Sequence, residues 1–421
     1  MLRISNGFCI CAKSFLCMQH NIIERSGYTQ RILHILDRGM MVALTGQRRV
    51  GKSCVMRGVR DVVSQNPANN ILYIDKENVR YDAIRTYSDL YTYVTENILS
   101  EKTNYLFIDE VQEIADFEKA VLSLHNEGVC RIIVTGSNAK MLSGELSTRL
   151  RGRYMEIRIR GLSYMEFLQF HNLADDDRAL ELFLQYGGLP QLRLLGLEEQ
   201  DIVTDYLGNI YDTIVLRDVI ERESIRNIPL LRSLLKFLSD NIGKQFSARS
   251  IVKFLKSQSV DTSANIILNY LSYLSNAYII DRVERYNIHG KKILELGEKY
   301  YFEDLGIRNR IIGGNRQFDI EKLMENAVYR HLRQLGFTVF VGQLRKGEID
   351  FVAEKADRTV YIQVTYLLAN QETVDREFGN LRAITDSHPK YVVSMDRMSG
   401  FANVDGIRHL HLRSFLALSD L

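Results

Sequence analysis

The sequence is short of net charge, of cysteines and of long apolar runs, and each shortage excludes a class of protein. Its 54 Lys and Arg against 52 Asp and Glu leave a formal net charge of +2 over 421 residues, so the whole chain gives no electrostatic argument for nucleic acid. Its five cysteines have neither the spacing of metal ligands nor that of a disulfide framework, which favours a reducing, cytoplasmic environment. No apolar run is long enough to span a bilayer, so no membrane partner is expected.

The first 20 residues do not resemble the rest of the chain. They hold Cys9, Cys11 and Cys17, and Lys13 interrupts the stretch that would otherwise resemble the core of a signal peptide. Two interpretations stay open: a weakly structured N-terminal arm, or a translation start placed too early, with Met18 as the alternative start. The length of the chain and its ordinary hydrophobic content of 46% predict two or three globular domains.

The most informative stretch is GQRRVGKS, which directly follows the apolar run MMVALT. A glycine-rich turn between a buried strand and a helix directs backbone N–H groups at one point, where the helix N-terminus also attracts anions. In this pattern Lys52 reaches the β- and γ-phosphates of a nucleotide and the Ser53 hydroxyl ligates Mg²⁺, which predicts ATP and Mg²⁺ as cofactors. The alternative is a glycine turn without a ligand. The expected binding residues are Gly46, Gln47, Arg48, Arg49, Val50, Gly51, Lys52, Ser53 and Cys54.

Strand-like and helix-like segments alternate around this loop. Apolar runs at 40–45, 71–74, 105–108 and 131–135 are separated by segments of helical character such as 52–64 and 89–99. Alternation of this kind predicts an α/β fold with a mainly parallel sheet between helices.

Two acids follow the third strand, in the sequence YLFIDE. Ligands of open α/β sheets bind at the carboxyl ends of the strands, so we expect Asp109 and Glu110 to face the phosphate loop. Asp109 is then the residue that holds Mg²⁺, and Glu110 is the catalytic residue that orients the attacking water. The alternative is that the two acids only cap a helix.

Further polar residues follow the fourth strand. Ser137 and Asn138, in VTGSN, are expected at the same sheet edge, where Asn138 would sense the γ-phosphate, unless they only form a turn. Among the closely spaced Arg149, Arg151 and Arg153, we select Arg153 as an arginine finger acting in cis or toward a neighbouring subunit. The alternative is that these arginines are solvated surface charges.

Together GQRRVGKS, LFIDEVQEI, VTGSN, RGRY followed by LSYMEF, and YGGLP resemble the bacterial AAA+-type P-loop ATPases of the clade that includes the archaeal and signal-transducing ATPases. The resemblance implies ATP hydrolysis and a helical lid whose Gly-Gly-x-Pro turn lies near the base and ribose. It thereby places Gly188 and Pro190 at the nucleotide. Without the resemblance, GGLP is a loop between two helices.

The segment after the lid predicts a winged helix. Three compact helical patterns, with Ser247 and Thr262 as expected caps of the second and third, precede two strands of a hairpin. Residues 226–299 contain 12 basic and 6 acidic residues, which fits contact with the phosphates of double-stranded DNA. A protein partner is the alternative, because the third helix has no Arg or Lys to read a base. The basic candidates are Arg249, Lys253, Lys256, Lys291 and Lys292.

The last segment resembles the core of PD-(D/E)XK nucleases in its order of one helix, three strands, a helix and a strand. The resemblance places Glu325, Asp350 and Gln363 at metal positions and Thr365 at that of the lysine. An amide at Gln363 and a hydroxyl at Thr365 supply neither the charge that Mg²⁺ prefers nor a cationic amine, so we expect no nuclease activity. Lys346, in the preceding loop, is the candidate for a replacement amine.

We therefore expect an α/β protein with five segments. They are an N-terminal arm (1–20), a P-loop ATPase core (21–165), a helical lid (166–225), a winged helix (226–317) and a degenerate nuclease-like domain (318–421). The main hypothesis is an Mg²⁺-dependent ATPase that acts as a nucleotide-driven switch on a protein partner or on a second copy of itself. A DNA-binding module that uses ATP as a conformational switch, and an ATP-gated nuclease, are the alternatives.

Overall fold

The computed structural model describes residues 25–137, 152–313, 319–368, 371–397 and 403–421, which form two compact units. The first unit contains residues 25–45, 51–136 and 152–158. The second contains residues 46–50, residue 137 and the described residues from 159 onward. Residues 46–50 of the glycine-rich loop therefore group with the second unit, although the strand before them and the helix after them belong to the first.

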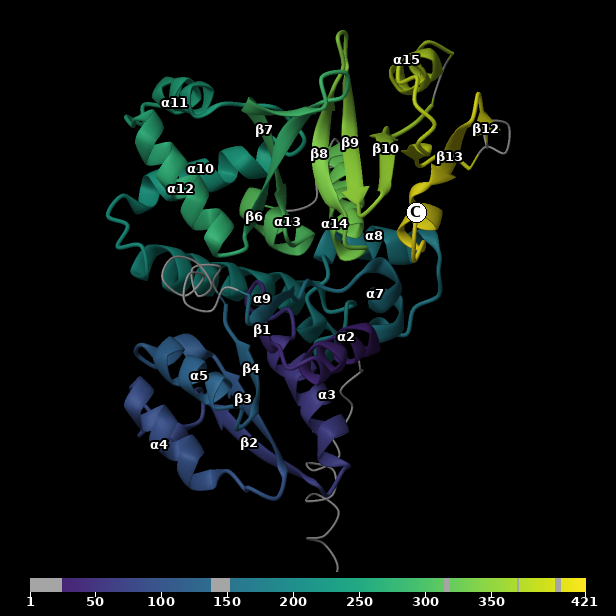
Figure 1. Cartoon of the computed structure of the whole chain (residues 1–421). Helices are drawn as coiled ribbons and strands as arrows, with labels where there is room; N and C mark the ends of the chain where they lie inside the picture. Colours follow the sequence, from purple (N-terminus) through teal and green to yellow (C-terminus); the bar gives the residue numbers. More distant parts are fainter. Residues whose placement is uncertain (1–24, 138–151, 314–318, 369–370, 398–402) are drawn as a thin grey trace, which may run out of the picture. The chain divides into compact units, whose positions relative to one another are not determined.

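A five-stranded sheet is the centre of the first unit (Figure 1). The strand order is β2-β3-β4-β1-β5, and every neighbouring pair is parallel. The strands are β1 (Met41–Thr45), β2 (Asn69–Asp75), β3 (Thr103–Asp109), β4 (Arg131–Thr135) and β5 (Tyr154–Arg158). All five residues of β1 and six of the seven in β3 are buried, as expected for strands that are covered on both faces. The parallel sheet predicted from the alternation is thus confirmed.

Among the described residues, one α-helix precedes β1 and three connect successive strands from β1 to β4, as parallel pairing requires. They are α2 (Ser26–Asp37), α3 (Lys52–Ser64), α4 (Tyr87–Asn97) and α5 (Phe117–Asn126), with short 3₁₀ turns η1 (Val79–Tyr81) and η2 (Val111–Glu113). Thr86 begins α4 with a capping box that it forms with Asp89. Apolar faces of α4 and α5, including Leu90, Val94 and Leu124, pack against β2, β3 and β4.

The strand that the sequence did not reveal is β5. Its sequence is YMEIR, and only Ile157 is buried, because β5 lies at the edge of the sheet and pairs with β1 alone. An edge strand needs fewer apolar residues than a central strand, so the apolar pattern of this segment is too weak to predict a strand.

The second unit begins with helices and continues into a second sheet. The helical elements are α7 (Tyr164–His171), α8 (Asp177–Tyr186), η4 (Pro190–Leu194), α9 (Gln200–Thr213), the π-helical η5 (Ile214–Glu221), α10 (Ile228–Asp240), α11 (Ala248–Ser257), α12 (Ala264–Asn276), α13 (Leu305–Ile312), α14 (Ile320–Gln334), α15 (Gln371–Arg382) and α16 (Leu412–Leu416). The helix α13 is buried almost all round, with Leu305 to Asn309 inaccessible to solvent. It lies in the interior of this unit.

An eight-stranded mixed sheet completes the second unit, in the order β12-β13-β11-β10-β9-β8-β6-β7. Its strands are β6 (Ile280–Asn287), β7 (Lys292–Phe302), β8 (Thr338–Gln343), β9 (Glu348–Lys355), β10 (Arg358–Val364), β11 (Lys390–Ser394), β12 (Asn403–Val404) and β13 (Ile407–His411). One apolar cluster lies between this sheet and α15, where Phe378 and Leu381 are buried. Rings of α14 and β9 meet through Tyr329 and Phe351.

The β6–β7 hairpin belongs to this same sheet. The sequence analysis assigns the hairpin to a winged helix that ends at residue 317, but β6 pairs in parallel with β8, for example Arg285 with Val341. Hydrogen bonds therefore cross the expected boundary, and the three helices α10, α11 and α12 lead into a sheet that continues to the C-terminal region. Pairing between strands so distant in sequence leaves no local pattern.

One predicted helix cap is wrong. Ser247 caps α11 as expected, through a capping box with Ser250. The cap of α12 is Ser263, whose side chain accepts a hydrogen bond from the backbone N–H of Ile266, and not Thr262. Ser263 directly precedes the first helical residue and has extended backbone angles, which is the geometry that a cap requires.

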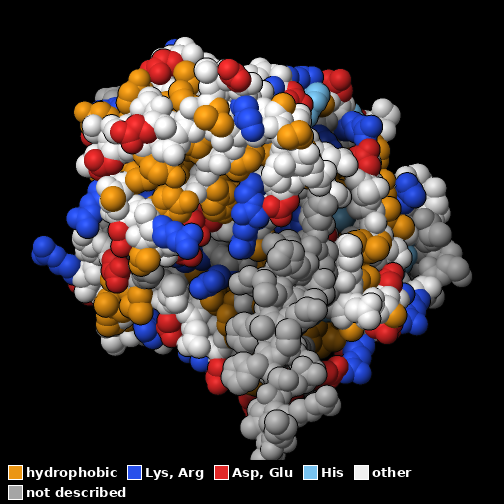
Figure 2. Space-filling view, turned by 90° about the horizontal axis from the view of Figure 1, so that it is seen from below, with side chains coloured by type: hydrophobic (Ala, Val, Ile, Leu, Met, Phe, Trp, Pro, Cys, Tyr) orange, Lys and Arg blue, Asp and Glu red, His pale blue; other side chains and the backbone are white. Residues whose placement is uncertain are grey.

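None of the described helices has the length and apolar character needed to cross a membrane. On the face drawn in Figure 2, Lys and Arg side chains lie among Asp, Glu and hydrophobic side chains, so neither sign of charge dominates it. This mixture agrees with the near-zero net charge of the sequence.

Candidate functional site

The phosphate loop has the backbone conformation that an anion cradle needs. Gly46 and Gly51 have φ angles of 134° and 95°, and Arg49 between them has 67°. At Gly46 a Cβ atom would stand 2.1 Å from the carbonyl oxygen of Ile159, so only glycine fits there. Gly51 is the N-cap of α3 and carries no side chain that would occupy the N–H groups of the first helical turn.

Helix α3 begins with Lys52 and Ser53, the two residues for which the sequence predicts contacts to phosphate and Mg²⁺. Lys52 is buried, and Ser53 forms a side-chain hydrogen bond to the Asp109 carboxylate at the end of β3. Cys54, the last residue of the predicted set, is half-buried and its Sγ lies 3.4 Å from the guanidinium of Arg57. The start of α3 and the end of β3 are thus brought together in the first unit.

Thr135 connects Asp109, the last residue of β3, with Glu110, which follows it. Ile108 of β3 pairs with Val134 of β4, so the next residues, Asp109 and Thr135, end neighbouring strands. The Thr135 hydroxyl donates a hydrogen bond to Asp109 Oδ1 at 2.5 Å and accepts one from the backbone N–H of Glu110 at 2.9 Å. Thr135 is completely buried. The sequence analysis missed this residue, although its position at the end of a strand was the available signal.

The backbone of Glu110 is not extended, because β3 ends at the preceding residue. Its φ and ψ of 53° and 54° lie in the left-handed region and begin the 3₁₀ turn η2. Gln112 donates a hydrogen bond to Glu110 Oε2 from within that turn. For a non-glycine residue this backbone conformation is uncommon and costs free energy, so the hydrogen bonds of Thr135 and Gln112 are what hold Glu110 in place.

Burial controls the protonation of Asp109. It raises the pKa of the carboxyl group above its usual value, while hydrogen bonds from Thr135 and Ser53 lower it and the charges of Glu110 and Asp75 raise it further. Asp75 ends β2 directly opposite Asp109 in the sheet. It is a third carboxylate at this edge that the sequence analysis did not single out.

Residues 46–50 have their own partners in the second unit. Arg48 Nε lies 2.6 Å from Asp218 Oδ2 in η5, and the Asp218 side chain is only 1% exposed. Arg222, one turn further along, lies 3.8 Å from the other oxygen of Asp218. Loss of either partner would leave a buried charge without compensation, so this ion pair holds the phosphate loop to a π-helical segment. No local pattern around Arg48 or Asp218 predicts this pair.

The GGLP turn has a structural explanation in the second unit. A Cβ at Gly187 would stand 2.5 Å from the Asp304 carboxylate, and one at Gly188 would stand 2.6 Å from the carbonyl oxygen of Leu162. The backbone N–H of Gly188 donates to Asp304 Oδ2 at 2.8 Å, and Pro190 begins η4. Close packing therefore requires both glycines, and a role of Gly188 and Pro190 at the nucleotide stays a prediction.

Among the remaining predicted residues of this region, the structure describes Ser137 and Arg153. Asn138, Arg149 and Arg151 lie outside the described residues. Ser137 is fully buried, and its hydroxyl has no hydrogen-bond partner among the described residues. Arg153 directly precedes β5 at the opposite, amino edge, where its carbonyl accepts from the N–H of Met41 at 3.0 Å.

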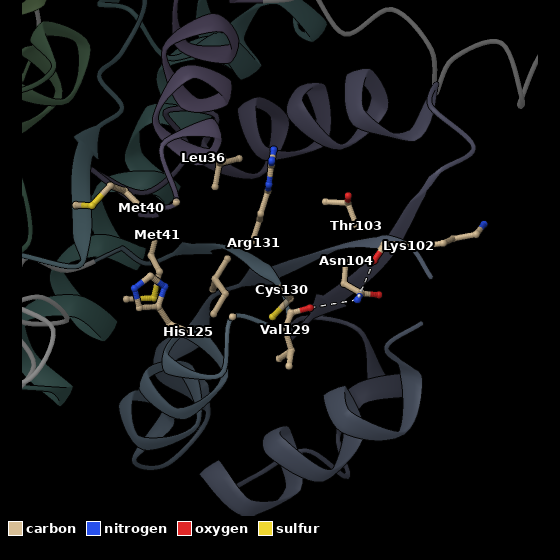
Figure 3. A pocket seen from close by; sticks show the side chains of 13 residues that line it. Leu36, Met40, Met41, Lys102, Thr103, Asn104, His125, Val129, Cys130 and Arg131 are labelled. Carbon is tan, nitrogen blue, oxygen red and sulfur yellow. Dashed lines mark hydrogen bonds between the residues drawn. The ribbon is translucent and has the colours of Figure 1, made fainter. Parts of the chain in front are cut away.

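A cavity of about 400 Å³ opens at that amino edge. Its wall includes the starts of β1, β3 and β4, and within this wall the Asn104 amide donates to the carbonyl oxygens of Lys102 and Val129 (Figure 3). Burial raises the pKa of the Cys130 thiol to about 12, which keeps this side chain neutral. The cavity is therefore separate from the carboxyl edge that holds Asp109, Glu110 and Thr135.

The nuclease-like residues come together in the second unit around an unexpected side chain. Glu325 of α14 and Asp350 of β9 both face the ammonium group of Lys299, which β7 supplies. Gln363 Oε1 accepts a long hydrogen bond, 3.4 Å, from the backbone N–H of Asp350. Lys346 is exposed in the turn between β8 and β9.

The residues of the first unit fit a magnesium ion that a nucleotide brings. Mg²⁺ in phosphoryl-transfer sites is held by one or two protein oxygens together with phosphates and water. Ser53 and Asp109, already hydrogen-bonded, are such a pair. Within the described ranges, no three His, Cys, Asp or Glu side chains are arranged, as they stand, to hold a metal ion.

Two domain families match the chain. Residues 38–168 match the AAA domain, and residues 177–317 match a domain of unknown function, DUF8612. The AAA match includes the phosphate loop, Asp109, Glu110 and Thr135 and ends within α7.

Relatives of similar length also match. An uncharacterized protein of Haemophilus influenzae is 32% identical over 406 residues, which cover 95% of this chain and 100% of that protein. An uncharacterized protein of Methanocaldococcus jannaschii is 30% identical over 347 residues, 79% of this chain and 76% of that protein. Among solved structures, a Walker-type ATPase of Pyrococcus abyssi is similar with a TM-score of 0.48 and 14% identity, over 68% of this chain and 95% of that one.

Proposed function

Because the chain belongs to the same family as the Haemophilus influenzae protein and carries an AAA domain, we propose that it is an Mg²⁺-dependent ATPase that acts as a nucleotide-driven switch. The observation that carries the proposal is the buried Asp109 carboxylate, which accepts hydrogen bonds from Ser53 and Thr135 beside the start of α3. Burial of a carboxylate costs free energy, and the binding of a metal ion is one way in which that cost is compensated.

The binding role belongs to the start of α3. Its N–H groups and Lys52 bind the phosphates, and Ser53 and Asp109 are the residues that would hold Mg²⁺. When bound, the metal neutralises charge that develops on the phosphate oxygens during transfer. The Thr135 hydroxyl keeps Asp109 oriented and stabilises its ionised form, because it donates to Oδ1.

Glu110 is the residue that orients and activates the attacking water. Its backbone is held by Thr135 and its carboxylate by Gln112, so both ends of the residue are fixed before a nucleotide arrives. A group held in advance costs little reorganisation when charge develops in the transition state.

The switch operates through the phosphate loop. Arg48 is bound to the buried Asp218 of η5, so a change in loop conformation on nucleotide binding acts directly on that helix. A π-helix is a strained arrangement that is often found at functional sites, and it has the alternative of an ordinary α-helical register. This segment connects α9 to the three helices α10, α11 and α12 along the chain.

Double-stranded DNA is a second candidate partner, for which exposed charge is the supporting observation. Arg249, Lys253 and Lys256 of α11 are all solvent-exposed, as contact with phosphates requires. The third helix, α12, instead exposes Ile266 and Leu268. Backbone contact without base reading is therefore the form of DNA binding that we propose, and a protein partner is the alternative.

Arg153 is also exposed, at the amino edge of the first sheet. We keep it as a candidate arginine finger toward a second copy of the chain, because its position at that edge favours action in trans over action in cis. Dependence of the specific ATPase rate on protein concentration, abolished in Arg153→Ala, tests this role.

The decisive experiment measures steady-state ATP hydrolysis by the purified full chain, with and without double-stranded DNA. Lys52→Ala, which removes the phosphate-binding amine, is expected to abolish ATP binding in calorimetry and turnover with it. Lys76→Ala is the matched control, since the ammonium group of Lys76 donates to the backbone carbonyls of Tyr81 and Ile84 and the substitution leaves its backbone N–H in place. If Lys52→Ala binds ATP with unchanged affinity, the ATPase proposal is refuted.

The same assay also tests whether DNA is the partner. Stimulation of turnover by DNA that is lost in the triple variant Arg249→Ala, Lys253→Ala, Lys256→Ala would support DNA as the partner. If DNA does not change the rate of ATP hydrolysis, a protein becomes the favoured partner of the switch. The proposal of ATPase activity would stand in that case.

A further inference from the structure

One lysine lies at the centre of three carboxylates in the second unit. Lys299 Nζ is 2.6 Å from Glu348 Oε1, 3.0 Å from Glu325 Oε1 and 3.6 Å from Asp350 Oδ1. The lysine side chain is 3% exposed. The acids come from α14 and β9, whereas the lysine comes from β7, in the hairpin that the sequence analysis assigned to another domain.

The carboxylates are the kind of ligand set that holds a hard divalent cation. Two of them stand on the same face of β9, at positions 348 and 350, and the third projects from the helix α14. Carboxylate oxygens from two or more elements that converge on one point are typical Mg²⁺, Mn²⁺ or Ca²⁺ ligands. Here the point of convergence is occupied by an ammonium group of the protein.

Lysine remains charged in this position. Burial alone would lower the pKa of Lys299, but the charges of Glu325, Asp350 and Glu348 raise it above its ordinary value. The same surroundings raise the pKa of Asp350 to about 8, through burial first and the charge of Glu325 second. One internal cation thus compensates a cluster that has more acids than bases.

Other protein donors take up further oxygens of the cluster. Tyr301 donates to Glu325 Oε1 at 2.6 Å, and the backbone N–H of Val364 donates to Asp350 Oδ2 at 2.8 Å. Gln245 donates to Glu348 Oε2. Each acid is therefore bound by Lys299 and by a second donor, a pattern of hydrogen bonds that a metal ion would have to displace.

We propose that Lys299 is a built-in cation that replaces a divalent metal among Glu325, Glu348 and Asp350, and that removal of its ammonium group turns the cluster into a divalent-cation site. The ion pairs of Lys299 thereby hold the hairpin strand β7 against α14 and β9 without a metal. The position at which a metal would activate water for phosphodiester cleavage is closed. This inference does not rest on the ATPase proposal, because the cluster contains none of the residues assigned to the nucleotide.

The test measures Mn²⁺ binding to the full chain without nucleotide, from the loss of the free-ion signal in electron paramagnetic resonance. We compare the wild type, Lys299→Met and Lys299→Met with Asp350→Asn. Lys292→Met, an exposed lysine of the same strand, is the matched control. Lys299→Met is expected to gain one Mn²⁺ site at least about tenfold tighter than any in the control, since affinity follows the number of charged ligands. Asp350→Asn in that background should weaken it again.

Two results would overturn the proposal. One is a Mn²⁺ site in the wild type that Asp350→Asn removes, above all if plasmid DNA is then cut in a metal-dependent way, because the cluster would be a working metal centre. The other is a folded Lys299→Met that binds no Mn²⁺.

The variant itself is open to misfolding, since it leaves buried carboxylates without their cation. In that case Lys299→Met is refolded with and without Mn²⁺. Recovery of the wild-type circular dichroism spectrum only with Mn²⁺ supports the replacement, and equal failure in both conditions refutes it. Tyr301, hydrogen-bonded to Glu325, provides a further readout through sensitised Tb³⁺ luminescence, and the chain has no tryptophan to interfere.

Discussion

Thr135→Val removes the hydroxyl that connects Asp109 to Glu110 while it preserves the shape of the side chain. In the wild type this hydroxyl donates to a carboxylate at 2.5 Å and accepts from the Glu110 N–H at 2.9 Å, with no exposure to water. After the substitution, a buried oxygen and a buried N–H both lose their partner. A hydrogen bond to a charged group contributes about 1.5–3 kcal/mol and an unpaired buried donor costs about 1–3 kcal/mol, so we expect a loss of about 2–4 kcal/mol in the free energy of unfolding.

The same substitution has a consequence for pH. The hydrogen bond from Thr135 favours the ionised form of Asp109, so its removal raises the pKa of that carboxyl group beyond the effect of burial. An Asp109 that stays protonated to higher pH binds Mg²⁺ less well there. The acidic limb of the ATPase pH profile should therefore move to higher pH, and the Mg²⁺ concentration for half-maximal rate should rise.

Thr135→Ser is the matched control, because it keeps the hydroxyl and loses only a methyl group, a change worth about 1 kcal/mol. Urea unfolding and ATPase rates between acidic and neutral pH are measured for both variants. If Thr135→Val and Thr135→Ser have the same pH profile and the same Mg²⁺ dependence, Thr135 does not control Asp109 and the derivation fails.

Three further predictions follow from the described contacts. Glu110→Gln should keep ATP affinity in calorimetry but lose turnover, and normal turnover would exclude Glu110 from the mechanism. Asp218→Asn weakens the buried pair with Arg48 and should lower stability by about 2–3 kcal/mol and alter ATP affinity; an unchanged affinity would remove Arg48 from the switch. Because the pKa of Asp350 is raised to about 8, the native state retains a proton that the unfolded state loses near pH 4, so this group lowers stability as pH rises through that window. Asp350→Asn should flatten that part of the stability profile in urea titrations, and an equal slope in both proteins would contradict the assignment.

The phosphate loop could be predicted from the sequence because its geometry is local. Glycines at positions 46 and 51, a buried strand before them and a helix after them are all contained in about 25 residues, and the structure places each where the pattern requires. The same holds for Asp109, whose place at the end of a buried strand identifies the sheet edge on which it lies.

Thr135 and Asp75 could have been found by an extension of the same reasoning. Each is the last residue of a parallel strand next to β3, and strand ends in a parallel sheet meet at one edge. What the sequence did not contain was the strand order, which decides that β2 and β4, and not β1, are the neighbours of β3.

Lys299 shows where prediction from the sequence reaches a physical limit. In the nuclease pattern, the lysine lies two residues after an acid in the same strand. Side chains two residues apart in a strand lie on the same face of the sheet. Here that position, directly after β10, holds Thr365, and the amine comes from β7, which reaches the acids because the β6–β7 hairpin joins the sheet through β8. A charge can be supplied from any strand that tertiary pairing brings within about 3–4 Å, and electrostatic attraction does not depend on separation along the chain. The type of group that the cluster needed was therefore predictable, whereas the residue that supplies it could be identified only once the pairing of the sheet was known.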